Sequence, residues 1–207
     1  ARDRGLLSND ILKTVTILNN WKEKNINPKI RKKKPRMAII TTSGGGLRSA
    51  LWSSCVLQLA DSATEGGLFQ RTALITGSSG GMIGAAYMRE LYLKKQKGEI
   101  NDLNGDTILT NISRDILNPL SFSLVLNDLF TRVHTFKDGN YTFGKDRGFA
   151  FENQLNQNIN NILNKRLNDY EAPEQNAIVP IMILTPTIIN DGRRLIISAQ
   201  KVSYLTN

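Results

Sequence analysis

The chain has 207 residues, of which 40% are hydrophobic and 22% charged, and this composition predicts a soluble globular protein with a sizeable core. No run approaches the roughly 18 consecutive apolar residues of a membrane-spanning helix, and the charged first residues do not resemble a secretory signal. A single cysteine, Cys55, and a single histidine, His134, exclude an internal disulfide and multi-cysteine or multi-histidine metal sites. We therefore expect a cytoplasmic protein with no metal and no cofactor.

The net charge of +9 comes from the first 50 residues, which carry 12 Lys and Arg against three acids, whereas the remainder carries 15 of each. The densest part is a run of six cations: Lys29, Arg31, Lys32, Lys33, Lys34 and Arg36. Such a run suits peripheral contact with an anionic membrane, and it is equally typical of a solvated connector. Nucleic acid is not expected, because the run contains no interleaved aromatic residues.

The first 36 residues are predicted to form an N-terminal region, followed by one domain over residues 37–207 that is expected to be incomplete at its C-terminus. Residues 9–21 have apolar side chains at helical spacing and predict an amphipathic helix. These side chains are Ile11, Leu12, Val15, Ile17, Leu18 and Trp21. A proline-containing basic connector then leads to residue 36.

Two strand, glycine turn, helix units come next. The first has a strand over residues 37–42 and a helix over 47–60, and the second has a strand over 72–76 and a helix over 82–97. Two such units in succession predict an α/β fold with a mainly parallel sheet, in which both turns open on the same edge. In the first helix we expect four residues to pack in the core: Leu51, Trp52, Cys55 and Leu59.

The remaining chain has a weaker pattern. Residues 98–148 predict short helices and a long mobile loop, and residues 151–167 predict a polar, asparagine-rich helix. Residues 179–189 and 194–202 resemble strands, and the intervening Asn190-Asp-Gly192 is a hairpin-turn signal.

The second glycine turn, Gly77-Ser-Ser-Gly-Gly81, matches the pattern G-x-S-x-G with Ser79 at its centre. Between a strand and a helix, such a turn exposes the serine hydroxyl at a helix N-terminus, where developing negative charge is stabilised. Ser79 is therefore a candidate nucleophile. The alternative is a turn that only packs a helix closely on a strand.

The first turn, Ser43-Gly-Gly-Gly-Leu-Arg-Ser49, supplies backbone amides with no side chain in the way, as an oxyanion hole requires. Gly44, Gly45 and Gly46 are the candidate donors, with Arg48 ordering the loop or meeting a phosphate. A dinucleotide-binding turn is the alternative, because the glycines half match G-x-G-x-x-G. No Gly-Lys-Ser/Thr follows them, which excludes a Walker A loop.

Together the two turns resemble the patatin-like phospholipases, and the first is especially similar to the motif of the cytosolic group-IV phospholipases. The resemblance runs from about residue 37 to residue 86. It implies a three-layer α/β sandwich, a Ser79 nucleophile, and an oxyanion hole at the amides of Gly45 and Gly46 supported by Gly44 and Arg48. It also implies a Ser-Asp dyad, so that no histidine is needed.

The resemblance does not assign the aspartate of that dyad to a single residue of this sequence. The family's Asp-Gly-Gly or Asp-Gly-Ala motif has only two partial counterparts, Asp138-Gly139 and Asp191-Gly192, and the second is explained by a hairpin turn. We therefore expect the acid beyond Asn207, with Asp191 as the weaker candidate. A Ser-His alternative would use His134, with Asp102, Asp106, Asp115 or Asp128 as its partner.

The sequence thus predicts a serine acyl hydrolase that cleaves acyl esters of phospholipids or related lipids. A non-catalytic module that binds lipid or nucleotide on the same fold is the alternative.

Overall fold

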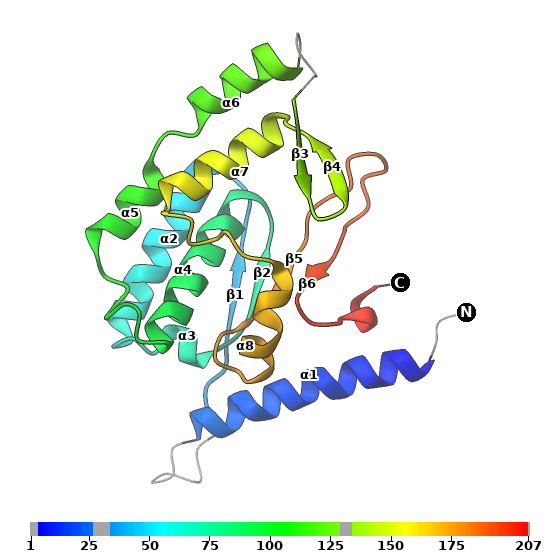
Figure 1. Ribbon diagram of the computed structural model, residues 1–207. Helices are drawn as coiled ribbons and strands as arrows, with labels where there is room; N and C mark the ends of the chain where they lie inside the picture. The colour runs from blue at the N-terminus through cyan, green and yellow to red at the C-terminus, as the bar shows by residue number, and fades with distance from the viewer. Residues whose placement is uncertain (1–3, 27–33, 129–133, 207) are drawn as a thin grey trace. The chain divides into compact units, whose positions relative to one another are not determined.

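The computed structural model describes residues 4–26, 34–128 and 134–206 (Figure 1). The chain forms two compact units: unit 1 comprises residues 1–105 and 165–207, and unit 2 comprises residues 106–164. Residues on both sides of the predicted division at residue 36 belong to unit 1. No helix in the described ranges combines the length and apolarity needed to cross a membrane.

Unit 1 is built on a four-stranded mixed sheet with the order β1-β2-β5-β6. The first three strands are parallel, and β6 runs antiparallel to β5. Their bounds are β1 Ala38–Thr42, β2 Thr72–Gly77, β5 Ile181–Leu184 and β6 Ile197–Ser198. The predicted α/β class with a mainly parallel sheet is confirmed. The two C-terminal strands are much shorter than predicted, and between them in the chain Thr187 and Arg194 form an isolated antiparallel bridge.

Helices lie on both faces of this sheet. Thr42 Oγ1 contacts Met82 Sδ of α4 (Ser79–Gln96) at 3.6 Å, so the face that carries Thr42 is covered by α4. Ile17 of α1 (Arg4–Asn25) packs with Ile181 and Ile183 on β5, together with Leu74 of β2. Thr42 pairs with Gly77 of β2, and Leu74 lies three residues before Gly77, so positions 74 and 77 point to opposite faces of the sheet. Leu74 pairs with Ile181, and α1 therefore covers the face opposite to α4.

The predicted N-terminal helix is confirmed and extends beyond its predicted bounds, but its apolar residues are not all buried. Ile17 and Trp21 are buried, whereas Ile11, Leu12 and Val15 are exposed, with Leu12 at 64%. The predicted amphipathic helix thus buries only part of its apolar residues in unit 1. The reason is the shortness of β5: a strand of four residues supports only the part of a 22-residue helix that crosses it.

The helix that follows the first glycine turn is α2 (Gly46–Ala63). It packs closely against α4, because a Cβ atom on Gly84 would meet the Ala50 carbonyl oxygen at 2.2 Å. Two residues of α2 that were predicted to pack in the core are exposed: Trp52 at 70% and Leu59 at 63%. They lie on the side of α2 that faces away from Ala50, which is buried. Cys55 is half-buried.

A buried ion pair joins α4 to α8 (Glu171–Gln175). Arg89 Nη1 donates to Glu174 Oε1 at 2.5 Å and to the Pro180 carbonyl at 3.1 Å. Glu174 also accepts from Met182 N and from Gln200 Nε2, each at 3.1 Å. Burial raises the pKa of Glu174 above its ordinary value, against the opposing pull of Arg89. This pair holds the C-terminal part of unit 1 on α4.

The smaller elements of unit 1 connect these parts. They are α3 (Leu68–Arg71) and the 3₁₀ turns Leu167–Tyr170 and Ser203–Leu205. Two contacts tie α1 to the C-terminal part: Thr14 Oγ1 lies 2.9 Å from Tyr204 Oη, and Asn20 Nδ2 donates to the Gln175 carbonyl at 2.8 Å.

Unit 2 contains short helices and a hairpin. The elements are α5 Asp106–Ser113, α6 Leu117–Ser123, the π-helical turn Leu124–Asp128, β3 Thr135–Asp138, β4 Tyr141–Gly144 and α7 Arg147–Asn158. The short helices were predicted, but part of the predicted long loop is the antiparallel pair β3–β4. The predicted polar helix over residues 151–167 begins earlier and ends at Asn158. Asp146 caps its start by accepting from Phe149 N at 3.0 Å.

Candidate active site

The two glycine turns meet at the carboxyl edge of the sheet. The register of β1 and β2 ends with Thr42 beside Gly77, so the turns that follow leave from the same edge, as the parallel arrangement predicted. A Cβ atom added to Gly44 would lie 3.3 Å from Ser79 Cβ and 3.5 Å from Ser79 Oγ. The backbone of the first turn therefore lies directly against the side chain of Ser79.

Ser79 occupies a tight turn between β2 and α4. It is exposed, has a left-handed backbone with φ of 58°, and is the first residue of α4, three residues before the predicted start at Met82. The next two positions admit only glycine. A Cβ atom on Gly80 would meet the Gly46 carbonyl oxygen at 1.7 Å, and one on Gly81 would meet the Ser43 carbonyl oxygen at 2.3 Å.

Two helix N-termini converge at this corner. The helix α2 begins at Gly46 and α4 begins at Ser79, and neither start has a side-chain cap or an acidic residue in its first turn. The first amides of a helix have no acceptor within it, and both helix ends carry partial positive charge. The corner therefore favours negative charge that develops beside Ser79. Gly45 and Gly46 have φ of 140° and 62°, a conformation that glycine adopts readily.

Arg48 lies in the first turn of α2 and is exposed. Among the described residues its side chain makes no hydrogen bond or ion pair. Its guanidinium adds positive charge to the same helix end and is available to an anionic group.

Two residues that the sequence interpretation did not single out hold the corner together. Ser49 Oγ donates to the Ser43 carbonyl at 3.0 Å and closes the first turn. Thr185, directly after β5, donates to the Gly77 carbonyl from both its amide, at 2.9 Å, and its hydroxyl, at 3.0 Å. The only sequence signal for Thr185 is its place after an apolar strand, where parallel pairing brings it beside Gly77.

The candidate acids and the candidate base belong to segments other than the turn of Ser79. Asp191 is at the tip of the turn after β5, where Arg193 Nε donates to it at 2.8 Å. This hydrogen bond lowers the pKa of the Asp191 carboxyl. Asp138 and His134 are exposed residues of unit 2, whereas Ser79 belongs to unit 1. In the described part of the chain, no side chain hydrogen-bonds the Ser79 hydroxyl.

The predicted membrane-contact run lies only partly within the described residues. Lys29, Arg31, Lys32 and Lys33 fall outside them, whereas Lys34 and Arg36 are described and exposed. Both come just before β1 and therefore lie at the amino edge of the sheet. With a rise of about 3.3 Å per residue, the five residues of β1 separate that edge from the glycine turns by roughly 17 Å.

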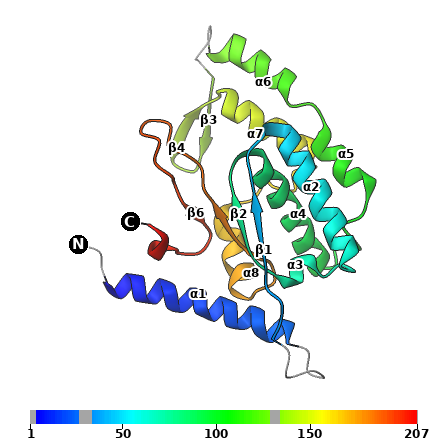
Figure 2. The same ribbon diagram turned by 180° about the vertical axis from the view of Figure 1, so that it is seen from behind.

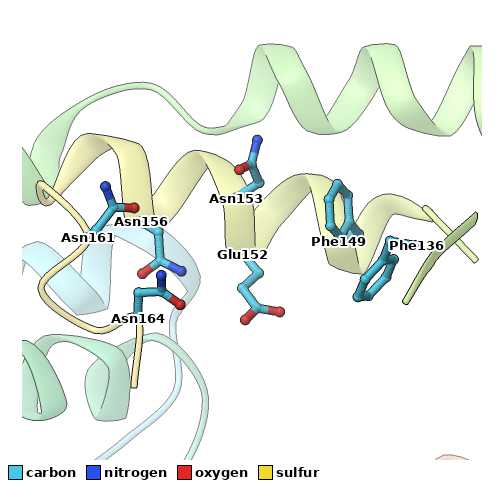
Figure 3. Close-up of a pocket in the computed structure, with 7 residues that line it drawn as sticks. All are labelled: Phe136, Phe149, Glu152, Asn153, Asn156, Asn161 and Asn164. Atoms are coloured by element: carbon cyan, nitrogen blue, oxygen red, sulfur yellow. The ribbon is translucent and has the colours of Figure 1, made fainter. Parts of the chain in front are cut away.

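Unit 2 has a polar pocket of its own, with a volume of about 190 Å³ (Figure 3). Asn156, Asn161 and Asn164 gather at one end of it, and Phe136 and Phe149 lie at the other with ring centroids 4.6 Å apart. Glu152 and Asn153 complete the lining. Amide side chains offer both donors and acceptors, so the lining suits a polar ligand. The sequence signal is the asparagine-rich composition of α7.

Comparison of the chain with known protein families, with curated proteins and with solved structures finds no match. The likeness to patatin-like phospholipases thus depends on the two glycine motifs. The chemistry of the site depends on the geometry of Ser79 and of the amides around it.

Proposed function

We propose that this chain carries the nucleophile and the oxyanion hole of a serine acyl hydrolase of the phospholipase A or lysophospholipase type. The observation that carries this proposal is the position of Ser79: an exposed hydroxyl on a left-handed turn, at the start of α4, against the bare backbone of Gly44. A nucleophilic serine needs this combination of access and nearby donors.

The proposed reaction begins when Ser79 Oγ attacks the carbonyl carbon of an acyl ester and loses its proton to a general base. The amides of Gly45 and Gly46 stabilise the oxyanion that forms, and one such donor contributes about 3 kcal/mol in related sites. The ester oxygen then leaves as a protonated alcohol, and the acyl group stays on Ser79. Water, deprotonated by the same base, attacks the acyl carbon and releases a carboxylic acid and free Ser79.

An aspartate is the proposed base, as in the dyad of the patatin-like phospholipases. The described geometry does not favour Asp191 for this role, because two hydrogen bonds from Arg193 stabilise its carboxylate. A carboxylate stabilised in this way accepts a proton less readily.

Two features support a patatin-like three-layer arrangement and a lipid substrate. The helices α4 and α1 cover opposite faces of the parallel strands, which is the layering that such a sandwich requires. The excess of positive charge in residues 29–36 suits contact with an anionic membrane.

A fluorophosphonate probe tests the nucleophile directly. Wild-type chain should be labelled, Ser79→Ala should not, and the neighbouring Ser78→Ala should keep its label. Equal labelling of wild type and Ser79→Ala, or loss of label in Ser78→Ala alone, contradicts the assignment of Ser79.

A non-catalytic module that binds lipid or nucleotide is the second candidate. It is favoured by one observation: no described side chain hydrogen-bonds the Ser79 hydroxyl. In that case binding to liposomes or nucleotide survives Ser79→Ala, and ester hydrolysis stays undetectable in the full-length protein. Measurable hydrolysis that disappears in Ser79→Ala excludes this candidate.

A further inference from the structure

The hairpin between β5 and β6 shares the edge of the sheet with Ser79. It spans residues 186–195 and begins directly after Thr185, whose amide and hydroxyl bond to Gly77 two residues before Ser79. Figures 1 and 2 show the hairpin extending beyond the end of β5 before the chain turns back to β6. The basic residues Lys34 and Arg36, in contrast, lie at the amino edge of the sheet.

The hairpin is held by its own hydrogen bonds. Ile188 N donates to the Arg193 carbonyl, Gly192 N to the Ile188 carbonyl and Leu195 N to the Pro186 carbonyl, each at 2.8 Å. The tip is further fixed where Arg193 N donates to Asp191 Oδ1 at 3.0 Å. A side chain at this tip therefore has a defined direction relative to β5.

Ile189 stands at this tip with 97% of its surface exposed, more than any other large apolar residue in the described part of the chain. Single exposed apolar residues are common on protein surfaces. An isoleucine with almost no protein contact, at the end of a braced hairpin, is different because the fold itself gains nothing from its apolar surface. Leu195, at 43% exposure, adds a second apolar residue on the same hairpin.

The residues behind this tip carry a net charge of +1, from Arg193 and Arg194 against Asp191. Arg193 is 78% exposed even though it pairs with Asp191, and the neighbouring Arg194 is exposed as well. Arginines placed behind an apolar tip match the two layers of a lipid surface, in which acyl chains lie beneath anionic headgroups. A stable protein interface would need about 1,000 Å² of complementary surface, which one projecting side chain does not supply.

We propose that the β5–β6 hairpin docks unit 1 on an anionic lipid surface, with Ile189 among the acyl chains and Arg193 and Arg194 at the headgroups. Docked in this way, the edge of the sheet that carries Ser79 faces the lipid. Only this last consequence rests on the proposed hydrolase function, because lipid docking does not require catalysis. The basic residues at the opposite edge do not bring Ser79 to the same surface.

The experiment measures partition of the 207-residue chain onto sedimenting vesicles of phosphatidylcholine, with and without phosphatidylserine. Ser79→Ala is used as the background so that no lipid is consumed. Ile189→Asp is compared with Leu12→Asp, which makes the same change at a residue of α1 that is 64% exposed. On anionic vesicles Ile189→Asp should lower the partition coefficient about tenfold or more, and Leu12→Asp should leave it within about twofold.

Three results overturn the proposal: no partition of the background chain onto anionic vesicles, equal partition with Ile189→Asp, or equal losses in the two variants. The proposal is also overturned if the background chain self-associates in sedimentation velocity and Ile189→Asp abolishes that association, because the tip would then bind a second copy of this chain.

Turnover separates this proposal from the hydrolase itself. In the full-length protein with Ser79 intact, Ile189→Asp should lower hydrolysis of vesicle lipid and leave hydrolysis of a soluble short-chain ester unchanged. If no ester is cleaved but partition still depends on Ile189, the hydrolase proposal fails and the docking surface stands. If ester is cleaved but partition does not depend on Ile189, the docking surface fails alone.

Discussion

The contact between the two glycine turns can be tested by placing one methyl group between them, with Gly80→Ala. The added Cβ atom would lie 1.7 Å from the Gly46 carbonyl oxygen and 2.6 Å from its carbon. Real Cβ contacts stay above 3.0 Å, so the two backbones must separate by about 1.3 Å. Because both sides of the contact are backbone, no side-chain rotation relieves it.

The expected loss of stability follows from two opposing effects. Overpacking of this kind costs about 1–3 kcal/mol, and a rigid backbone contact belongs at the upper end. Alanine in place of glycine favours the helix by about 1 kcal/mol. The net loss in the free energy of unfolding is therefore about 2 kcal/mol, which lowers the urea midpoint by about 1 M for an m-value near 2 kcal/mol/M.

The assay is urea unfolding followed by far-UV circular dichroism, together with fluorophosphonate labelling of Ser79. Gly98→Ala is the control for an added methyl group that meets no neighbour: no atom lies within 4 Å of a Cβ added to Gly98, although Gly98, unlike Gly80, has a left-handed φ of 75°. It should lose only the strain of that conformation, about 1 kcal/mol, and keep its label. If Gly80→Ala is as stable as wild type and is fully labelled, the described contact between the turns is wrong.

Three further predictions concern buried and exposed charge. Arg89→Met leaves Glu174 buried without its partner and should cost about 3–5 kcal/mol in urea unfolding, whereas Lys94→Met breaks an exposed pair and should cost under about 1 kcal/mol. Because burial raises the pKa of Glu174, its contribution to stability is full below its ordinary value of 4.5 and is lost as pH rises through the raised pKa. Glu174→Gln should therefore flatten that part of the curve of stability against pH. Asp191→Asn should leave fluorophosphonate labelling of Ser79 unchanged, and a loss of label would identify Asp191 as the base.

The parts of the fold that could be predicted depend on short stretches of sequence. The strands β1 and β2 are apolar runs that end in glycine turns, so their type and their shared edge follow from local patterns. The hairpin β3–β4 was missed because its aromatic residues alternate with polar ones on two strands of only four residues each. In this hairpin Gly139 and Asn140 form the turn, and Asp138 is the last residue of β3.

Burial on the helices could not be predicted in the same way, because it depends on partners far away in the chain. Ile17 and Leu12 are both apolar residues of α1, yet only Ile17 meets β5, more than 160 residues later. Trp52 is equally apolar and lies outside the packed side of α2. Helical spacing identifies an apolar face, but it does not say whether the sheet extends far enough to cover that face.

The residues of the candidate site could likewise be predicted only where their signal is local in the sequence. Ser79 and Gly44 could be found because the chemistry requires serine and glycine within recognisable turns. Thr185 could not, because its two hydrogen bonds to Gly77 exist only once β5 has paired beside β2. Its side chain has no pattern in the sequence that distinguishes it from any threonine at the end of a strand.

The backbone of Ser79 argues for a role of its hydroxyl. A left-handed φ costs a residue with a side chain about 1 kcal/mol relative to glycine, and the flanking Gly77, Gly80 and Gly81 show that this turn uses glycine wherever space or conformation requires it. Glu65 and Ala177 also have positive φ, but each follows the end of a helix, where a left-handed residue commonly terminates it. No such capping requirement applies to Ser79 at the start of α4. A turn that served packing alone would be more stable with a fourth glycine, so the serine is best explained by a reaction or contact of its exposed hydroxyl.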